Sequence, residues 1–258
     1  MEAKRRLEVA DAVFLGISLL GLAVLLYPFW APALPQPDQG RAALLLLSGV
    51  LAILLAALVG EAQAGLTPHT VALIGALVGL NSVIRMVETV IPLPGGFSPV
   101  FLLIILVGQA FGPRLGFLMG ALTMLVSGPL TAGGLGPWTP YQMLAAGWVG
   151  MGAAWLPKEH GKLAALLVYG AIWGLLYGAL TDLQYWPYAL GAPDLTWAPG
   201  LGPWAALVRY GRFYLVTSFV WDLLRLAGNV FLLLVLGAPL ASVLERFQRR
   251  ARVTWEPA

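Results

Sequence analysis

Two groups of polar side chains interrupt apolar stretches of the sequence, and in each group the residues follow one another at intervals of three or four. This spacing places the members of a group on one face of a helix. The first group is Asn81, Arg85 and Glu88. The second group is Ser218, Asp222, Arg225 and Asn229. Groups of this kind can bind a polar solute or hold helices together.

The charged members of these groups are expected to face the interior of the protein. A charge at the centre of a bilayer costs about 2.5–3.5 kcal/mol, so each should find a partner. Counting helical rise from the ends of the two apolar stretches puts Arg85 at the depth of Asp222. We therefore predict an Arg85–Asp222 ion pair between two neighbouring helices. Such a network would either line a solute cavity or serve only to lock the helices, and the sequence leaves both open.

A third candidate region is the glycine-rich segment Gly128–Gln142, which reads GPLTAGGLGPWTPYQ. Its glycines suggest mobility, and its aromatic and polar side chains could stack on a ligand and hydrogen-bond to it. These side chains are Trp138, Thr139, Tyr141 and Gln142. A hinged segment with an aromatic tip is typical of a lid over a ligand. An ordinary loop at the membrane interface is the alternative.

The elements that carry these residues are predicted to be membrane-spanning helices. The chain of 258 residues is 59% hydrophobic and 10% charged, whereas soluble domains are about 25% charged. Apolar runs of about 20 residues cross a bilayer as helices, because their backbone groups find no water there. We predict an all-α polytopic protein with eight spans, at about 12–30, 42–60, 70–91, 99–111, 115–128, 140–156, 163–183 and 213–238.

Two alternatives concern the boundaries of these spans. Residues 99–128 could form one kinked span, although Gly112-Pro113-Arg114 favours a turn that separates two short helices. The basic start MEAKRRLEVA before an apolar run could also belong to a signal peptide. We interpret that run as a retained first span, because it is long and no clear Ala-x-Ala cleavage site follows it.

The distribution of Lys and Arg predicts the orientation, since cytoplasmic loops carry more of these residues. An even number of spans with both termini in the cytoplasm gives a strong excess inside. The inner residues are Lys4, Arg5, Arg6, Arg114, Lys158, Lys162, Arg246, Arg249, Arg250 and Arg252. The outer residues are Arg41, Arg209 and Arg212. The net charge of +3 is therefore a topology signal and not a nucleic-acid footprint, and the segment 184–212 is expected to be a long outer loop.

Several kinds of chemistry lack their residues in this sequence. There are no cysteines, and the two histidines, His69 and His160, lie far apart. No phosphate-binding Gly-Lys-Ser/Thr motif and no GxSxG or HExxH motif occurs. We therefore expect no enzymatic activity, no metal site and no cofactor, and any active transport by this chain would depend on a separate ATPase.

Small residues recur on the predicted third span. Ala72 and Ala76 form Ala-x-x-x-Ala, and Gly75 and Gly79 form Gly-x-x-x-Gly on the adjoining face. Such spacings let helices approach closely. In a sequence so rich in alanine and glycine they are weak evidence for a partner subunit when taken alone.

Several short stretches together resemble the substrate-binding S components of energy-coupling factor (ECF) transporters. These stretches are Phe97-Ser98-Pro99, Phe111–Phe117, Gly120–Leu122, Gly136–Met143, Thr217-Ser218, Trp221-Asp222, Arg225 and Gly228-Asn229. The resemblance covers about residues 70–245. It implies a six-helix core at 66–245, preceded by a two-helix extension at 1–65 and followed by a basic cytoplasmic tail at 246–258.

The resemblance also implies a function in the cell membrane. S components capture a vitamin from outside and associate with a membrane coupling subunit and two cytoplasmic ATPase subunits. Ala72 and Ala76 match the motif that meets the coupling subunit in this family. The longer form resembles members predicted to carry cobalamin, and riboflavin or another vitamin is the alternative cargo. A membrane-embedded lipid-modifying enzyme and a ligand-free assembly protein are the alternatives of a different class.

Overall fold

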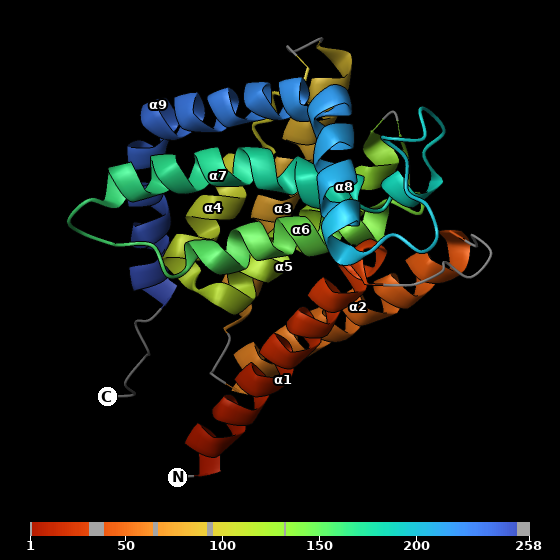
Figure 1. Cartoon of the computed structure of the whole chain (residues 1–258). Coiled ribbons are helices and arrows are strands. Elements are labelled where there is room, and N and C mark those ends of the chain that lie inside the picture. The colour runs from red at the N-terminus through yellow and green to blue at the C-terminus, as the bar shows by residue number, and fades with distance from the viewer. Residues whose placement is uncertain (1, 31–38, 64–66, 92–94, 132, 252–258) are drawn as a thin grey trace, which may run out of the picture.

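The computed structural model describes residues 2–30, 39–63, 67–91, 95–131 and 133–251, and all regular elements in these ranges are helices (Figure 1). The α-helices are α1 (Glu2–Leu25), α2 (Gln39–Gln63), α3 (Pro68–Val90), α4 (Val100–Phe111), α5 (Pro113–Ser127), α6 (Thr139–Ala153), α7 (Lys162–Asp182), α8 (Pro203–Thr217) and α9 (Phe219–Ala251). Three short 3-10 turns are η1 (Tyr27–Phe29), η2 (Gly128–Leu130) and η3 (Trp186–Tyr188). The predicted all-helical class is thus confirmed.

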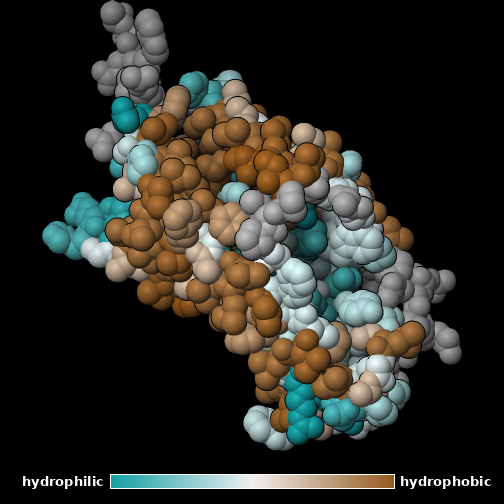
Figure 2. All heavy atoms as spheres, turned by 90° about the horizontal axis from the view of Figure 1, so that it is seen from above, coloured by the Kyte–Doolittle hydropathy of each residue, from teal (hydrophilic) through white to brown (hydrophobic). Residues whose placement is uncertain are grey.

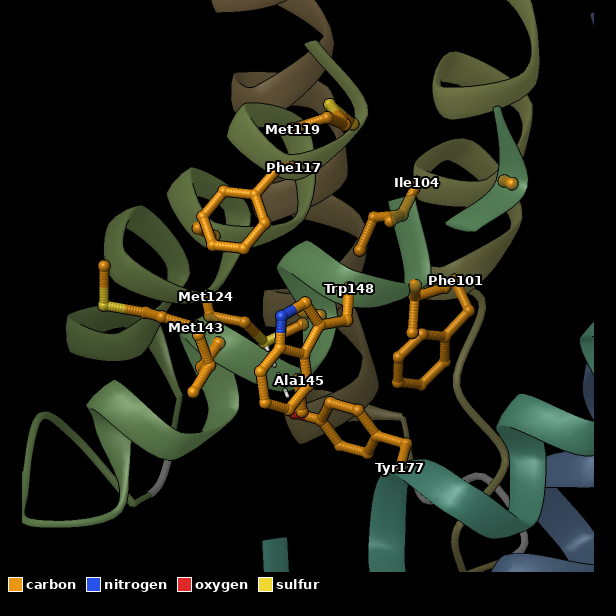
Figure 3. Close-up of a cluster of buried hydrophobic side chains, with 14 of the residues drawn as sticks. Phe101, Ile104, Phe117, Met119, Met124, Met143, Ala145, Trp148 and Tyr177 are labelled. Carbon is orange, nitrogen blue, oxygen red and sulfur yellow. Dashed lines mark hydrogen bonds between the residues drawn. The ribbon is translucent and has the colours of Figure 1, made fainter. Parts of the chain in front are cut away.

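The centre of the fold consists of α4, α5 and α6. Every residue of α4 from Val100 to Ala110 is buried, as expected for a helix that is apolar on all sides. Figure 3 shows the side chains around this centre, with Phe101 and Ile104 of α4 near Trp148 of α6. At a rise of about 1.5 Å per residue, the 12 residues of α4 extend about 18 Å, which is short for a hydrocarbon core about 30 Å thick.

A sharp turn separates α4 from α5. Gly112 has a φ of 99°, a conformation that favours glycine, and Pro113 occupies the first turn of α5. The turn lets α5 fold back on α4, so closely that a Cβ on Gly116 would lie 2.7 Å from the Cα of Gly108. Residues 99–128 therefore form two helices, as predicted, and not one kinked span.

Three helices have the length and composition to cross a membrane among the residues that the structure describes. Their apolar windows are Pro68–Glu88 in α3, Lys162–Tyr188 at α7, and Phe219–Gln248 in α9. Shorter apolar stretches occur at Phe14–Ala23 and Leu47–Gly60. Large exposed hydrophobic side chains cover the outer helices, and Figure 2 shows a broad hydrophobic area on one face of the molecule. This surface fits a membrane protein.

The last predicted span, 213–238, is wrong as a single helix. The chain bends at Ser218, whose N–H donates to the carbonyl of Tyr214 and ends α8. Helix α9 begins at Phe219, and α8 runs across the ends of α7 and α9 (Figure 1). The predicted outer loop 184–212 consequently contains η3 and much of α8. No Gly or Pro lies between Phe213 and Leu224, so the sequence offers no strong helix breaker at Ser218.

Helix α9 extends further than predicted. It continues through Pro239 to Ala251, and Figure 1 shows its last turns bending away from the first part. A proline inside a helix removes one backbone hydrogen bond and produces such a bend. The predicted tail 246–258 is therefore helical as far as Ala251, and its remainder lies outside the described residues.

The helical hairpin formed by α1 and α2 packs against α5 and α6. Asp11 forms an ion pair with Arg114 at the start of α5, at 2.6 Å. Ser18 accepts a hydrogen bond of 2.6 Å from the Trp148 indole of α6. Both contacts are polar and cross from the predicted N-terminal extension to the predicted core. The division at residue 65 remains a prediction.

Candidate functional site

The polar face of α3 contacts several other elements. Asn81 is fully buried and donates from its Nδ2 to the Val100 carbonyl at 3.0 Å and to Thr123 Oγ1 at 3.4 Å. Its Oδ1 has no hydrogen-bond partner. Four residues on, Arg85 donates to Ser127 Oγ at 2.8 Å and to Gln142 Oε1 at 3.3 Å. The guanidinium of Arg85 is thus held by α5 and α6.

Glu88, one turn further along α3, is bound to the segment that follows the helix. Its Oε1 accepts a hydrogen bond from Ser98 Oγ at 2.9 Å, and Ser98 also accepts from the Val100 N–H at 3.4 Å. These bonds fix the segment 95–99 against the end of α3. The half-buried carboxylate of Glu88 therefore lies beside the start of α4.

The second polar group is divided, because Ser218 ends α8 and the remaining members belong to α9, where Asp222 lies in the first turn. Asp222, whose side chain is 2% exposed, forms an ion pair with Arg225 of the same helix. Tyr214 of α8 donates a further hydrogen bond to Asp222 Oδ2 at 2.8 Å. Gly178 of α7 makes room for the carboxylate, because a Cβ there would lie 1.9 Å from Oδ2. Asp222 is therefore buried with its charge neutralised locally.

The predicted Arg85–Asp222 ion pair is wrong. Asp222 pairs with Arg225, and Arg85 has Ser127 and Gln142 as its partners. The prediction counted depth along a helix that was assumed to begin at residue 213. Because α9 begins at Phe219, Asp222 lies in the first turn of its helix, against Gly178 of α7.

The two groups nevertheless converge on one side chain, Tyr177 of α7. The Arg225 guanidinium lies over the Tyr177 ring, with 5.4 Å from Cζ to the centroid, and Phe101 of α4 makes an edge contact with the same ring at 4.7 Å. Figure 3 shows the hydroxyl of Tyr177 directed at Met124, 3.7 Å away. The charged side chains within electrostatic range of Tyr177 are Arg85, Glu88, Asp222 and Arg225. We call these four residues and Tyr177 the charged cluster.

The predicted lid residues lie in a different arrangement from the one expected. Thr139 and Tyr141 belong to the first turn of α6 and are buried, so they are not part of a hinged loop. Trp138 precedes the helix, and a Cβ on Gly136 would overlap its ring at 2.5 Å. Only Gln142 reaches the charged cluster, through Arg85. Helix initiation at Pro140 explains the difference, since proline favours the first turn of a helix.

Asn229 and the small residues of α3 complete the set of sequence candidates. Asn229 is buried and donates to the Gly170 carbonyl of α7 at 2.9 Å, while its Oδ1 has no partner. It joins α9 to α7. Ala72 and Ala76 are exposed on α3, so both are available for contact with another helix.

Sequence reasoning missed the feature that brings α7 and α9 together. Gly170, Gly174 and Gly178 repeat at intervals of four along α7. A Cβ on Gly174 would lie 2.5 Å from the Leu226 Cα of α9, and one on Gly170 would lie 2.5 Å from Leu233. This Gly-x-x-x-Gly repeat was readable in the sequence and indicates close helix packing. It also explains why Tyr177 and Asp222 become neighbours.

Comparison with known proteins found no relative of the chain. No protein family model, no curated protein and no solved structure matches the chain. Among the described residues, no group of three or more His, Cys, Asp or Glu side chains is placed to hold a metal ion. The function must therefore be argued from the site itself.

Proposed function

We propose that the chain is the substrate-binding subunit of an ECF-type importer that captures a vitamin outside the cell. The observation that carries the proposal is the charged cluster. Ionisable side chains inside an apolar helical protein are costly and usually mark a solute site or pathway. Here they come from three helices, and the cluster includes Arg85, which is bound to neutral groups alone within the described part of the chain.

The position of the cluster also supports capture of a solute. Glu88 is tied to the segment 95–99, and Arg85 is tied to Gln142 in the first turn of α6. The segments that lead into α4 and α6 therefore border the cluster. A ligand that bound at the cluster could reorder these connecting segments.

The proposed partner subunits follow from the lack of an ATP-binding motif in the sequence and from the small residues exposed on α3. The sequence contains no phosphate-binding motif for ATP, so uptake would require a membrane coupling subunit and two ATPase subunits. The exposed pair Ala72 and Ala76 is the proposed contact with the coupling subunit, because small side chains allow close approach of a second helix. Cobalamin is the first candidate cargo, and riboflavin is the second.

Isothermal titration of the purified chain in lipid nanodiscs against a panel of vitamins tests the proposal. We expect one vitamin to bind with a Kd of about 10 nM or lower, a binding free energy of roughly −11 kcal/mol. If no vitamin binds up to millimolar concentration, the uptake proposal fails. A ligand-free assembly protein would then be the better description.

A further inference from the structure

Three arginines that are buried or half-buried, Arg85, Arg114 and Arg225, differ in whether a carboxylate is their partner. Arg225 has the carboxylate of Asp222, and Arg114 has that of Asp11. Arg85 differs from both, since within the described residues its hydrogen-bond partners are a hydroxyl and an amide oxygen. No carboxylate is therefore among the hydrogen-bond partners of this guanidinium in the described part of the chain.

The neighbours of Arg85 orient it without neutralising it. Ser127 donates its own proton to the Thr123 carbonyl at 2.5 Å, which leaves its oxygen to accept from Arg85 at 2.8 Å. The Oε1 of Gln142 accepts from the other terminal nitrogen, Nη2, at 3.3 Å. A guanidinium has five N–H donors in a fixed plane, so two bonds leave further donors for a ligand. Holding the group in place before binding reduces the entropy that binding would otherwise cost.

The remaining charges near Arg85 do not replace a ligand. Asp222 is occupied by Arg225 and by Tyr214. Glu88 lies within electrostatic range of both arginines, yet its recorded hydrogen-bond partner is Ser98 and it forms no ion pair with Arg85 among the described contacts. Arg85 and Glu88 thus present a guanidinium and a carboxyl group that are close in space and share no hydrogen bond among the described residues.

We propose that Arg85 anchors a single anionic group of the cargo, a carboxylate or phosphodiester, and that Glu88 accepts a hydrogen bond from the same molecule. A planar guanidinium matches the oxygens of such groups in a bidentate geometry. The inference rests on the proposed uptake function and narrows its substrate class. Cobalamin contains a phosphodiester and satisfies it, whereas riboflavin contains no acidic group.

The test uses pairs of compounds of which one member has an acidic group and the other lacks it. Two of the pairs differ essentially in that group alone, whereas cobinamide lacks the whole nucleotide loop of cobalamin, phosphodiester included. The full chain, in nanodiscs of zwitterionic lipid, is titrated with cobalamin and cobinamide, riboflavin and flavin mononucleotide, and biotin and biotinamide. We expect binding only from an anionic member, and a loss of about 10- to 100-fold in affinity for Arg85→Gln. Arg212→Gln, which removes an exposed arginine of α8, should leave the affinity unchanged.

A second variant guards against misfolding of Arg85→Gln. Gln142→Glu places a carboxylate beside the Arg85 guanidinium with almost no change of shape, so the fold is retained while the charge is offset. It should weaken anion binding by at least tenfold. Equal binding of the neutral and anionic members, or equal effects of Arg85→Gln and Arg212→Gln, would overturn the inference while leaving the uptake function intact.

Two further outcomes distinguish failure of the anion site from failure of the uptake function, and a solute site from a lipid headgroup site. If no compound in the panel binds, the uptake proposal fails and the inference fails with it. The titration is repeated in nanodiscs that contain phosphatidylglycerol. Unchanged affinity supports a solute site at Arg85, whereas competition by the anionic lipid would show that Arg85 holds a headgroup and would overturn the inference.

Discussion

Asp222 is held by a group from one other helix as well as by one from its own. The side chain is 2% exposed and has Arg225 as its ion-pair partner and Tyr214 as a second donor. A buried charge that loses its partner is destabilising by about 3–5 kcal/mol. The charge of Asp222 is therefore stabilised by Arg225, three positions further along α9, and by Tyr214 of α8.

The first prediction at this scale concerns the identity of the partner. In double-mutant cycles measured by unfolding in detergent, Asp222→Ala and Arg225→Ala should be coupled by at least about 1 kcal/mol, because the two groups are in contact. Asp222→Ala and Arg85→Ala should be additive to within about 0.5 kcal/mol. Coupling of the second pair, with additivity of the first, would restore the interhelical ion pair that the sequence suggested.

The phenol of Tyr214 provides the second prediction. Tyr214→Phe removes one hydrogen bond to a buried carboxylate and should lower the free energy of unfolding by about 1.5–3 kcal/mol. The matched change Tyr185→Phe affects an exposed tyrosine whose recorded contact is through its ring, with Phe213, and should change stability by less than about 0.5 kcal/mol. Equal effects would mean that the Tyr214–Asp222 bond contributes nothing specific.

Glycines determine how closely the helices approach one another. A Cβ on Gly150 of α6 would lie 2.0 Å from the Gly116 carbonyl oxygen of α5, and one on Gly120 would lie 2.0 Å from the Ala146 carbonyl oxygen. These neighbours are backbone atoms, so they cannot move aside as a flexible side chain can. Helices that bury small residues against one another associate through van der Waals contact in membranes.

The prediction for these helices compares two glycine substitutions. Gly150→Ala should destabilise the fold by about 1–3 kcal/mol, because it forces α5 and α6 apart. Gly75→Ala changes a helical glycine with no atom within 4 Å of the added carbon and should stabilise the isolated chain by up to about 1 kcal/mol. Thermal unfolding of both variants in one detergent checks the difference. A Gly150→Ala protein as stable as the parent would contradict the described packing.

The elements also show which parts of the structure could be predicted from sequence. Hydrophobic runs predicted helices α2 to α7 closely, whereas α1 begins at Glu2, well before the predicted span 12–30. Gly112-Pro113 marked the turn between α4 and α5 because both residues have strong backbone preferences. The break at Ser218 lacked such a marker, so α8 and α9 were merged. Because of this error, the predicted depth of Asp222 along its helix was wrong, and so was the ion pair predicted from that depth. The contacts at Tyr177 depend on helix packing, which periodicity alone does not specify.

At the scale of the whole molecule, residues assigned to the inner side lie together at one end. Lys162 forms an ion pair with Glu245 at 2.5 Å, which joins the start of α7 to the last turns of α9. Gln109, near the end of α4, donates to the Pro157 carbonyl at 2.8 Å in the connection before α7. These segments occupy the left side of Figure 1. The distribution of Lys and Arg predicts that this end faces the cytoplasm.

The absence of cysteine from the sequence makes this orientation directly testable. Leu190, which is 97% exposed, lies in the connection between α7 and α8, and His160 is exposed in the connection between α6 and α7. Intact cells that carry Leu190→Cys or His160→Cys are treated with a membrane-impermeant maleimide. We expect labelling of Leu190→Cys in intact cells, and labelling of His160→Cys only after the cells are lysed.

The reverse pattern would place the connection that contains Leu190 in the cytoplasm. The segments around Glu88, Ser98 and Gln142 belong to the same predicted side as Leu190, because an odd number of predicted spans separates each from His160. The charged cluster would then open toward the cytoplasm, where it could not receive a solute from outside. Inverted labelling would therefore exclude uptake while leaving every contact in the fold unchanged, so orientation is the property on which the proposed function depends most directly.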